Sequence, residues 1–150
     1  MIESFSEFLD LVDRNDASSH LRLRTEMAPE SLWMEVISQR ADLKRIVTLN
    51  KTLGDPVIRL LARDNDPLIR CDIANRRRLP LEVFDLLVRD PDESVRARIA
   101  WNKKTPNEVL KRLLTDESRV VIEAVRKKLD LIVESLKGRN NKANYDAPRI

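Results

Sequence analysis

The chain repeats its residue pattern at an interval of 26 positions, and this regularity constrains its fold more than any other feature. Asn50 and Asn102 share one column of the repeat, although Asn75 stands one place early. A fixed period of this length is typical of stacked supersecondary units that bury their apolar faces only against one another. One column of aspartates and four apolar columns carry the pattern: Asp64, Asp90 and Asp116; Val57, Val83 and Val109; Leu61, Leu87 and Leu113; Leu43, Ile69, Val95 and Val121; and Val47, Ile73, Ile99 and Val125.

Each unit divides into two short helices. The first is expected to begin at a proline such as Pro106, because the N–H that proline lacks has no partner in a first helical turn. Val109, Leu110 and Leu113 then share one apolar face. The recurring aspartate ends this helix and opens the second with a side-chain cap, and the second helix ends ahead of the next proline. With only two glycines in the chain, this pattern favours an all-α fold.

The two ends depart from the repeat, as capping units do. Ser4 and Glu7 resemble a capping box ahead of an amphipathic first helix, and a degenerate helix is expected around residues 17–26. At the other end, apolar residues continue in helical register, which predicts one helix over 117–137 that stops at Gly138. We therefore predict one domain over residues 1–137, with caps at about 1–26 and 126–137, and a mobile basic tail over 138–150.

Composition excludes several classes of protein. A single cysteine and a single histidine argue against a disulfide framework, a metal centre and a Ser-His-Asp triad. No apolar run is long enough to span a bilayer and no signal sequence is evident, so we expect a cytoplasmic protein without membrane, metal or cofactor. The formal net charge is +3, and residues 137–150 carry four basic side chains against one aspartate, which leaves residues 1–136 neutral. This neutrality weakens the case for a nucleic-acid partner.

Residues 90–110 read Asp-Pro-Asp-Glu-Ser-Val-Arg-Ala-Arg-Ile-Ala-Trp-Asn-Lys-Lys-Thr-Pro-Asn-Glu-Val-Leu. This string resembles the variant leucine-rich repeat family, whose units place Asp, Val-Arg, Ala-x-Asn and Thr-Pro-x-x-x-Leu in this order. The motif is best at 90–116, good at 64–90 and partial at 43–64 and 116–125, and with caps the resemblance covers roughly 27–137. It implies an all-α, right-handed α-solenoid of stacked two-helix repeats, related to HEAT and armadillo proteins, with N- and C-terminal capping helices and no strands. It supplies no catalytic residue, and one cysteine cannot form the iron–sulfur cluster that some members carry.

Two further columns have structural interpretations. Lys44, Arg70 and Arg96 share a column beside buried apolar positions, which favours pairing with the aspartates of an adjacent unit over a grip on phosphate. Cys71 aligns with Ala97 and is interpreted as a small core residue rather than a reactive thiol. Neither column then points to chemistry at a site.

Seven residues form the predicted recognition face. Because Trp and Arg are common interface anchors, Trp101 and Arg98 are expected at its centre. The alternative for Trp101 is partial burial against a neighbouring loop. The seven lie on the second helices opposite the buried stripe, where the residue type changes from unit to unit while the scaffold repeats: Leu49, Leu68, Asp72, Asn75, Arg98, Trp101 and Lys127.

A second candidate surface, the basic ridge, has six residues. They occupy equivalent connections after the second helices and are expected to line one edge of the stack: Lys51, Arg76, Arg77, Arg78, Lys103 and Lys104. Bases at helix C-terminal ends compensate the helix dipole, but three consecutive arginines exceed what one helix end requires. The sequence leaves open whether the ridge binds an acidic partner or only stabilises helices.

Two functions follow from these surfaces. The first is a non-enzymatic protein-binding module, an adaptor or an inhibitor or immunity protein, that uses the recognition face. The second is a nucleic-acid-binding helical repeat protein that uses the basic ridge. An enzyme is least favoured: Asp72, Arg98 and Trp101 superficially resemble a trio in HEAT-like alkylpurine DNA glycosylases, but no extended motif matches. The partner's identity, the concave helix layer, and the choice between a monomer and a weak dimer stay open.

Overall fold

The computed structural model describes residues 1–143, and over residues 137–143 it describes the course of the helix only. All regular elements in this part of the chain are helical, which confirms the all-α class. They are α1 (Phe5–Arg14), α2 (Ala17–Thr25), α3 (Glu30–Gln39), a 3₁₀ turn (Ala41–Leu43) that leads into α4 (Lys44–Leu49), α5 (Asp55–Leu61), α6 (Pro67–Ala74), α7 (Leu81–Leu87), α8 (Glu93–Trp101), α9 (Asn107–Leu113) and α10 (Arg119–Ala143).

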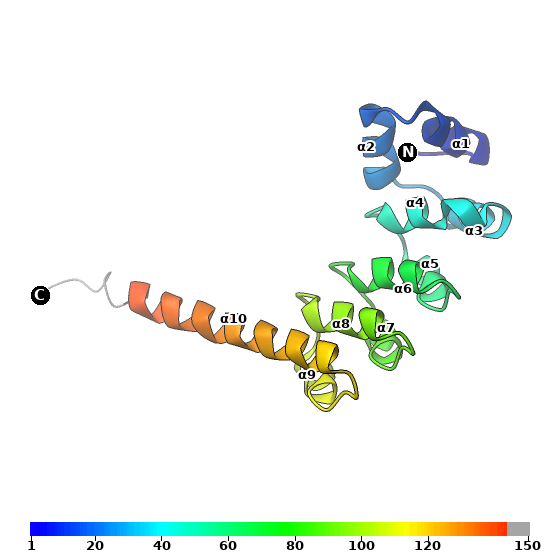
Figure 1. Cartoon of the computed structure of the whole chain (residues 1–150). Helices are drawn as coiled ribbons and strands as arrows, with labels where there is room; N and C mark the ends of the chain where they lie inside the picture. Colours follow the sequence, from blue (N-terminus) through cyan, green and yellow to red (C-terminus); the bar gives the residue numbers. More distant parts are fainter. Residues whose placement is uncertain (144–150) are drawn as a thin grey trace, which may run out of the picture.

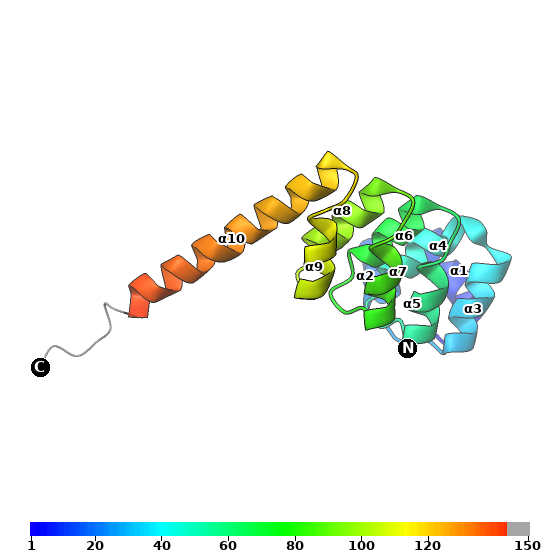
Figure 2. The ribbon, with the colours of Figure 1, turned by 90° about the horizontal axis from the view of Figure 1, so that it is seen from below.

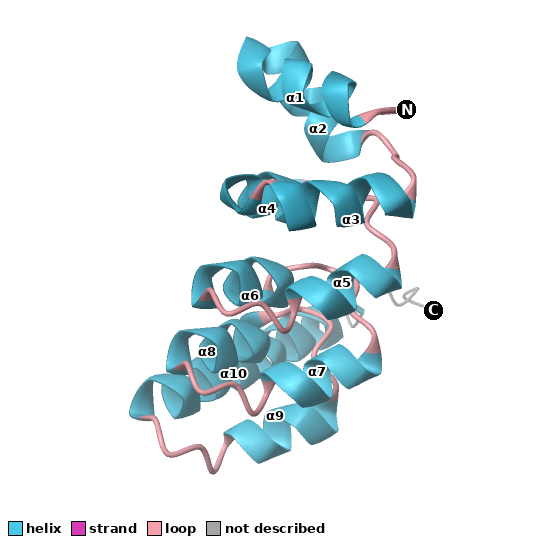
Figure 3. Ribbon diagram, turned by 90° about the vertical axis from the view of Figure 1, so that its right-hand side faces the viewer, coloured by secondary structure: helices cyan, strands magenta, loops and turns pink. Residues whose placement is uncertain are grey.

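The helices lie in two layers, which Figures 1 and 3 show as stacked pairs. Helices α1, α3, α5, α7 and α9 form the odd-numbered layer, and α2, α4, α6, α8 and the start of α10 form the even-numbered layer. Each even-numbered helix contacts the next one in order, and α8 with α10 is the most extensive of these contacts. The second half of α10 runs out beyond the stack (Figures 1 and 2). No helix among the described residues is long and apolar enough to cross a membrane.

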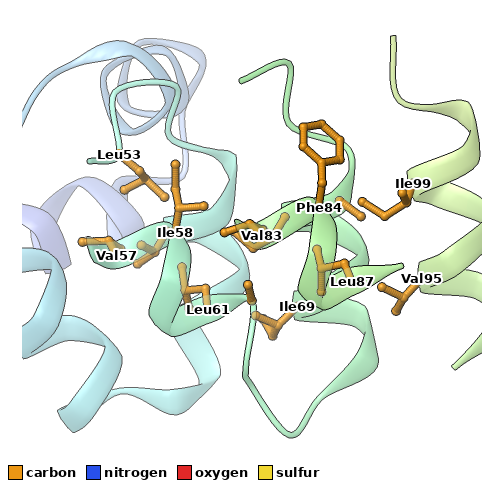
Figure 4. Close-up of a cluster of buried hydrophobic side chains, with 14 of the residues drawn as sticks. Leu53, Val57, Ile58, Leu61, Ile69, Val83, Phe84, Leu87, Val95 and Ile99 are labelled. Atoms are coloured by element: carbon orange, nitrogen blue, oxygen red, sulfur yellow. The ribbon is translucent and has the colours of Figure 1, made fainter. Parts of the chain in front are cut away.

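The core runs as a continuous band between the two layers. Every residue of the four apolar columns is buried, including Val57, Leu61, Ile73 and Ile99. Figure 4 shows the middle of this band, where side chains of α5, α6, α7 and α8 meet. At the amino-terminal end, the rings of Phe8 and Trp33 pack edge to face, with centroids 5.9 Å apart. Burial of each large aliphatic side chain of the four apolar columns stabilises the fold by about 1.5–3 kcal/mol, so these columns supply most of the driving force for stacking.

The predicted helix around residues 17–26 is α2, whereas α8 and α9 begin one or two residues after the predicted positions. Pro106 is the N-cap of α9 rather than its first helical residue, and it makes no side-chain cap. Helices α6 and α8 are capped by Asp66 and Asp92, whose carboxylates accept from the N–H groups of Leu68 and Ser94. The prediction that the recurring aspartates are the caps is therefore wrong, because the cap lies two residues later.

The ends of the chain follow the predictions in part. Ser4 caps α1 by accepting from the N–H of Glu7 at 3.1 Å, and the Glu7 carboxylate accepts from the N–H of Glu3, one residue before the position in a standard capping box. At the other end, α10 continues through Gly138 to Ala143, so the predicted stop at Gly138 is wrong. No described glycine has a positive φ, the conformation that such a stop requires. Residues 144–150 of the predicted tail lie outside the described residues.

Candidate functional site

Three ion pairs tie neighbouring even-numbered helices together near their N-terminal ends. We call them the ion-pair ladder: Lys44–Asp64 at 2.7 Å, Arg70–Asp90 at 2.7 Å and Arg96–Asp116 at 2.8 Å, with partners 20 residues apart in each case. Each cation lies in the first turns of one helix, and its aspartate precedes the next helix of the layer. The predicted pairing of this column with aspartates of an adjacent unit is confirmed.

The Arg96–Asp116 pair is one of two in the ladder whose side chains are almost fully covered, the other being Arg70–Asp90. Nε and Nη2 of Arg96 donate to both oxygens of Asp116 at 2.8 and 3.0 Å, and Nη1 donates to the carbonyl of Asp90 at 2.7 Å. Burial alone would raise the pKa of Asp116, but the hydrogen bonds from Arg96 and from the N–H of Ser118 outweigh it, and the pKa is lowered. Lys44, Arg70 and Arg96 therefore bind aspartates of this chain.

A second set of contacts joins the even-numbered helices from α2 to α10, each time at the C-terminal end of the earlier helix. We call it the carbonyl ladder, because its side chains donate to backbone carbonyls at the end of the preceding even-numbered helix: Asn50 to Leu23 and Glu26, Arg76 to Thr48 and Asn50, Asn102 to Ala74 and Arg76, and Lys128 to Asn102. The donors stand 26 residues apart. Carbonyls of a last helical turn have no partner within their helix, and the ladder supplies one.

The carbonyl ladder changes the interpretation of Arg76. The sequence groups it with the basic ridge, but its guanidinium turns inward and fills the column of Asn50 and Asn102. Burial lowers the pKa of Arg76, and its Nε has no hydrogen-bond partner among the described residues. Arg76 therefore binds backbone carbonyls at the C-terminal end of α4, and only the other five residues of the basic ridge remain on the surface.

The other five residues of the basic ridge remain on the surface. They follow the C-terminal ends of α4, α6 and α8, all are exposed, and none forms an ion pair with another described residue: Lys51, Arg77, Arg78, Lys103 and Lys104. Other basic side chains, such as Arg22, Arg59 and Arg96, are paired with carboxylates. The five residues thus give one edge of the even-numbered layer an uncompensated positive charge.

Most of the predicted recognition face is exposed on the even-numbered helices. Leu49, Leu68 and Trp101 expose 54%, 55% and 44% of their surface, which is high for large apolar side chains. Arg98 lies one turn before Trp101 in α8 and is also exposed. The structure therefore brings a tryptophan, an arginine and two leucines onto one helix layer.

The other three residues of the predicted face differ in their surroundings. Asn75 and Lys127 are exposed. Asp72 is half-buried, and its carboxylate accepts from Nε of Arg45 at 3.0 Å and from the hydroxyl of Thr48 at 3.2 Å. Asp72 thus joins α6 to α4, and its carboxylate is already engaged within the stack.

A pocket of about 260 Å³ lies where α1, α2 and α4 meet, and sequence analysis missed it. It is lined by Val12, His20, Leu23, Arg24, Ile46 and Leu49, of which only Leu49 was a candidate site residue. The sequence gives little signal here, because α1 and α2 fall outside the repeating columns.

The last helix of the stack presents a polar outer side. A pocket there is lined by Arg119, Ile122, Glu123 and Arg126. Arg126 stands 26 residues after Ala100, which is fully buried in α8. An exposed arginine at the position of a buried alanine suits a helix that ends the stack.

No group of His, Cys, Asp and Glu side chains in the described part of the chain is placed to hold a metal ion. Cys71 is half-buried, and burial raises the pKa of its thiol, which disfavours the reactive thiolate. Comparisons of the chain with protein-family models, with curated proteins and with solved structures find no match. The resemblance to the variant leucine-rich repeat family therefore depends on the sequence motif alone.

Proposed function

We propose that this chain is a non-enzymatic protein-binding module, a right-handed α-solenoid of variant leucine-rich repeat type with a 26-residue unit. In this proposal the even-numbered layer recognises another protein, and the chain serves as a cytoplasmic adaptor or as an inhibitor or immunity protein. The observation that carries the proposal is the exposure of Leu49, Leu68 and Trp101 on helices whose ends are tied to their neighbours. Large apolar side chains on a rigid surface are typical of interfaces.

The position of Trp101 supports its role as an anchor. It is the last residue of α8, with Arg98 one turn earlier and Lys103 and Lys104 just beyond it. Tryptophan and arginine dominate binding energy at many interfaces, where they are surrounded by residues that exclude water. A tryptophan that is 44% exposed in the free chain can bury a large additional apolar area on binding.

The double variant Trp101→Ala, Arg98→Ala tests the proposal. We expect it to lose partners that the original chain captures from a lysate of its source cell, as measured by quantitative mass spectrometry. We expect a somewhat lower melting temperature, because Trp101 is only 44% exposed and its truncation removes packed apolar surface. Capture is therefore compared at a temperature at which circular dichroism shows both chains to be folded. Leu60→Ala is the matched control, since Leu60 is 45% exposed on α5 in the other layer. Retention of the captured partners by the double variant would contradict the assignment of this surface.

A nucleic-acid partner is the second candidate, favoured by the five exposed cations of the basic ridge, which form no ion pair with a described residue. Phosphate binding by this ridge predicts an affinity that falls steeply as salt rises, with a slope reduced by Arg77→Ala and Arg78→Ala. Fluorescence anisotropy with a labelled single-stranded and a labelled double-stranded oligonucleotide measures this slope. Absence of binding at low ionic strength would remove the candidate, and the neutrality of residues 1–136 already argues against it.

A further inference from the structure

We propose that the pocket between α1, α2 and α4 receives an apolar side chain of a partner protein, beside which a carboxylate of the same segment pairs with Arg24. This inference rests on the proposed function in one respect, which is that the occupant is a protein segment. It adds a second anchoring point, at the amino-terminal end of the even-numbered layer, and it names the chemistry of the partner.

The pocket is formed in the free chain and is held open by hydrogen bonds. The backbone N–H of Lys51 donates to the carbonyl of Arg24 at 2.8 Å, and Asn50 donates to the carbonyls of Leu23 and Glu26. These contacts fix the ends of α2 and α4 relative to each other. A pocket that is already formed in the free chain loses less conformational freedom on binding, which lowers the entropic cost.

Four of the six lining residues are apolar, and the exposed side chains of His20 and Arg24 complete the lining. Leu23 is buried at one side, Val12 and Ile46 are half-buried and pack on the core, and Leu49 is more than half exposed. A pocket of about 260 Å³ with this lining admits a side chain of the size of leucine or phenylalanine. Covering the exposed part of Leu49 and the half-buried walls removes apolar surface from water, which favours binding.

The charge at the rim selects the rest of the partner. Arg24 is exposed at the pocket and forms no ion pair with a described residue, whereas Arg22 on the same helix is paired with Glu7 and Glu26. The Glu26 carboxylate is also engaged by the amino terminus at 3.2 Å. Lys51 is also exposed, and its backbone N–H donates to the carbonyl of Arg24, so a second cation lies close to the pocket. An apolar residue flanked by Asp or Glu complements this surface, and a basic segment does not.

The experiment is a selection of random short peptides by phage display on the full chain, followed by anisotropy measurements on a selected peptide. We expect selected sequences to combine a large apolar residue with carboxylates. Leu49→Asp should weaken the peptide about tenfold to a hundredfold, because it removes an apolar wall and repels the carboxylate. Arg24→Glu should weaken it and reduce its salt dependence. Leu60→Asp on α5 is the matched control and should have no effect.

Three results would overturn the pocket assignment: no peptide is enriched, the enriched peptides lack carboxylates, or Leu49→Asp binds them as well as the original chain does. The melting temperature of each variant shows whether a loss of binding is a loss of folding. Peptides that depend on Trp101 and Arg98 but not on Leu49 would overturn the pocket and leave the proposed function standing. Peptides that depend on Leu49, combined with partner capture that survives the Trp101 and Arg98 double variant, would support the pocket and overturn the central anchor.

Discussion

Removal of the Asp116 carboxylate tests whether the ion-pair ladder holds the even-numbered helices together. In Asp116→Ala, the guanidinium of Arg96 loses its contacts at 2.8 and 3.0 Å, and the N–H of Ser118 loses its acceptor. The side chains of Arg96 and Asp116 are only 7% and 8% exposed, although a surface pocket borders both of them. Removing one partner of a fully buried ion pair costs about 3–5 kcal/mol. This range is an upper limit for Asp116→Ala, because the carboxylate of Glu117 remains 3.5 Å from Nη2 of Arg96.

This loss is large compared with the stability of a domain, which is about 5–15 kcal/mol. For a chain of this length, each kcal/mol lowers the melting temperature by about 2–4 °C, so Asp116→Ala should melt up to about 20 °C below the original chain. Thermal and urea denaturation followed by far-ultraviolet circular dichroism measure the change. Asp64→Ala is the control, because Lys44 and Asp64 are 23% and 11% exposed and form a single contact. Its loss should be clearly smaller, since Lys44 can extend into water.

The double variant Arg96→Leu, Asp116→Ala completes the experiment. It removes both charges, so the cost of an unpaired buried guanidinium disappears and part of the stability lost in Asp116→Ala should return. The reasoning would be refuted if Asp116→Ala lost no more stability than Asp64→Ala, or if the double variant were no more stable than Asp116→Ala.

Three further predictions concern the carbonyl ladder, acid pH and the contact between α8 and α10. Arg76→Asn should keep the bonds to the carbonyls of Thr48 and Asn50 while removing a buried cation. Urea denaturation should therefore give a free energy of unfolding within about 1 kcal/mol of the original chain. Arg76→Ala removes the bonds and should lose about 1–3 kcal/mol. The pKa values of Asp64 and Asp116 are lowered in the folded chain. Their ion pairs therefore stabilise the fold fully above about pH 4, and this contribution is lost as the pH falls through the lowered pKa values. In a plot of the free energy of unfolding against pH, Asp116→Asn should show a smaller loss of stability at acid pH than the original chain. Ala100→Leu should cost about 1–3 kcal/mol of overpacking because Ala100 is fully buried, whereas the exposed Ser94→Leu on the same helix should leave the urea midpoint nearly unchanged.

The periodic apolar columns made the helices and the core predictable from the sequence. A column that stays apolar at a fixed interval can only be a buried position, because nothing else keeps Leu61, Leu87 and Leu113 alike. The same logic predicted the partners of Arg70 and Arg96, since a charged column beside a buried one needs a counter-charge at the same interval. Periodicity thus indicates which residues meet.

Periodicity does not decide between neighbouring residues of the same type. Asp90 and Asp92 both precede α8, and only the backbone course shows that Asp92 caps the helix while Asp90 binds Arg70. Gly138 failed as a stop signal for a related reason. A glycine within a helix costs only about 1 kcal/mol, and a stop also needs a left-handed residue, which α10 does not have there.

Three-dimensional contacts determine the parts of the candidate site that the sequence did not reveal. Arg76 differs in charge and size from Asn50 and Asn102, so the column looked broken, with Asn75 as the nearest match. The structure shows that these residues share their acceptors rather than their residue type. Each side chain donates to backbone carbonyls at the end of the preceding even-numbered helix. The pocket at Arg24 was missed because it joins a cap to the first regular pair, where no repeat aligns the two sides.

The two ladders explain how this scaffold can carry a variable surface. Near its N-terminal end, α6 is tied to its neighbours through Lys44–Asp64 and Arg70–Asp90, and at its C-terminal end through Arg76 and Asn102. With both ends fixed, exposed positions between them can change without loosening the stack. A residue that belongs to neither ladder and contacts no neighbouring helix is therefore available for the proposed recognition of another protein.

Asp72 tests this criterion, because it was predicted on the recognition face but contacts Arg45 and Thr48 of α4. By the same criterion Leu68, Arg98 and Trp101 remain available, since they are exposed and belong to neither ladder. Asp72→Ala should consequently reduce stability, and any effect on partner capture should follow the fraction of folded protein. Loss of capture by fully folded Asp72→Ala would show that packing and recognition are not separated in this chain.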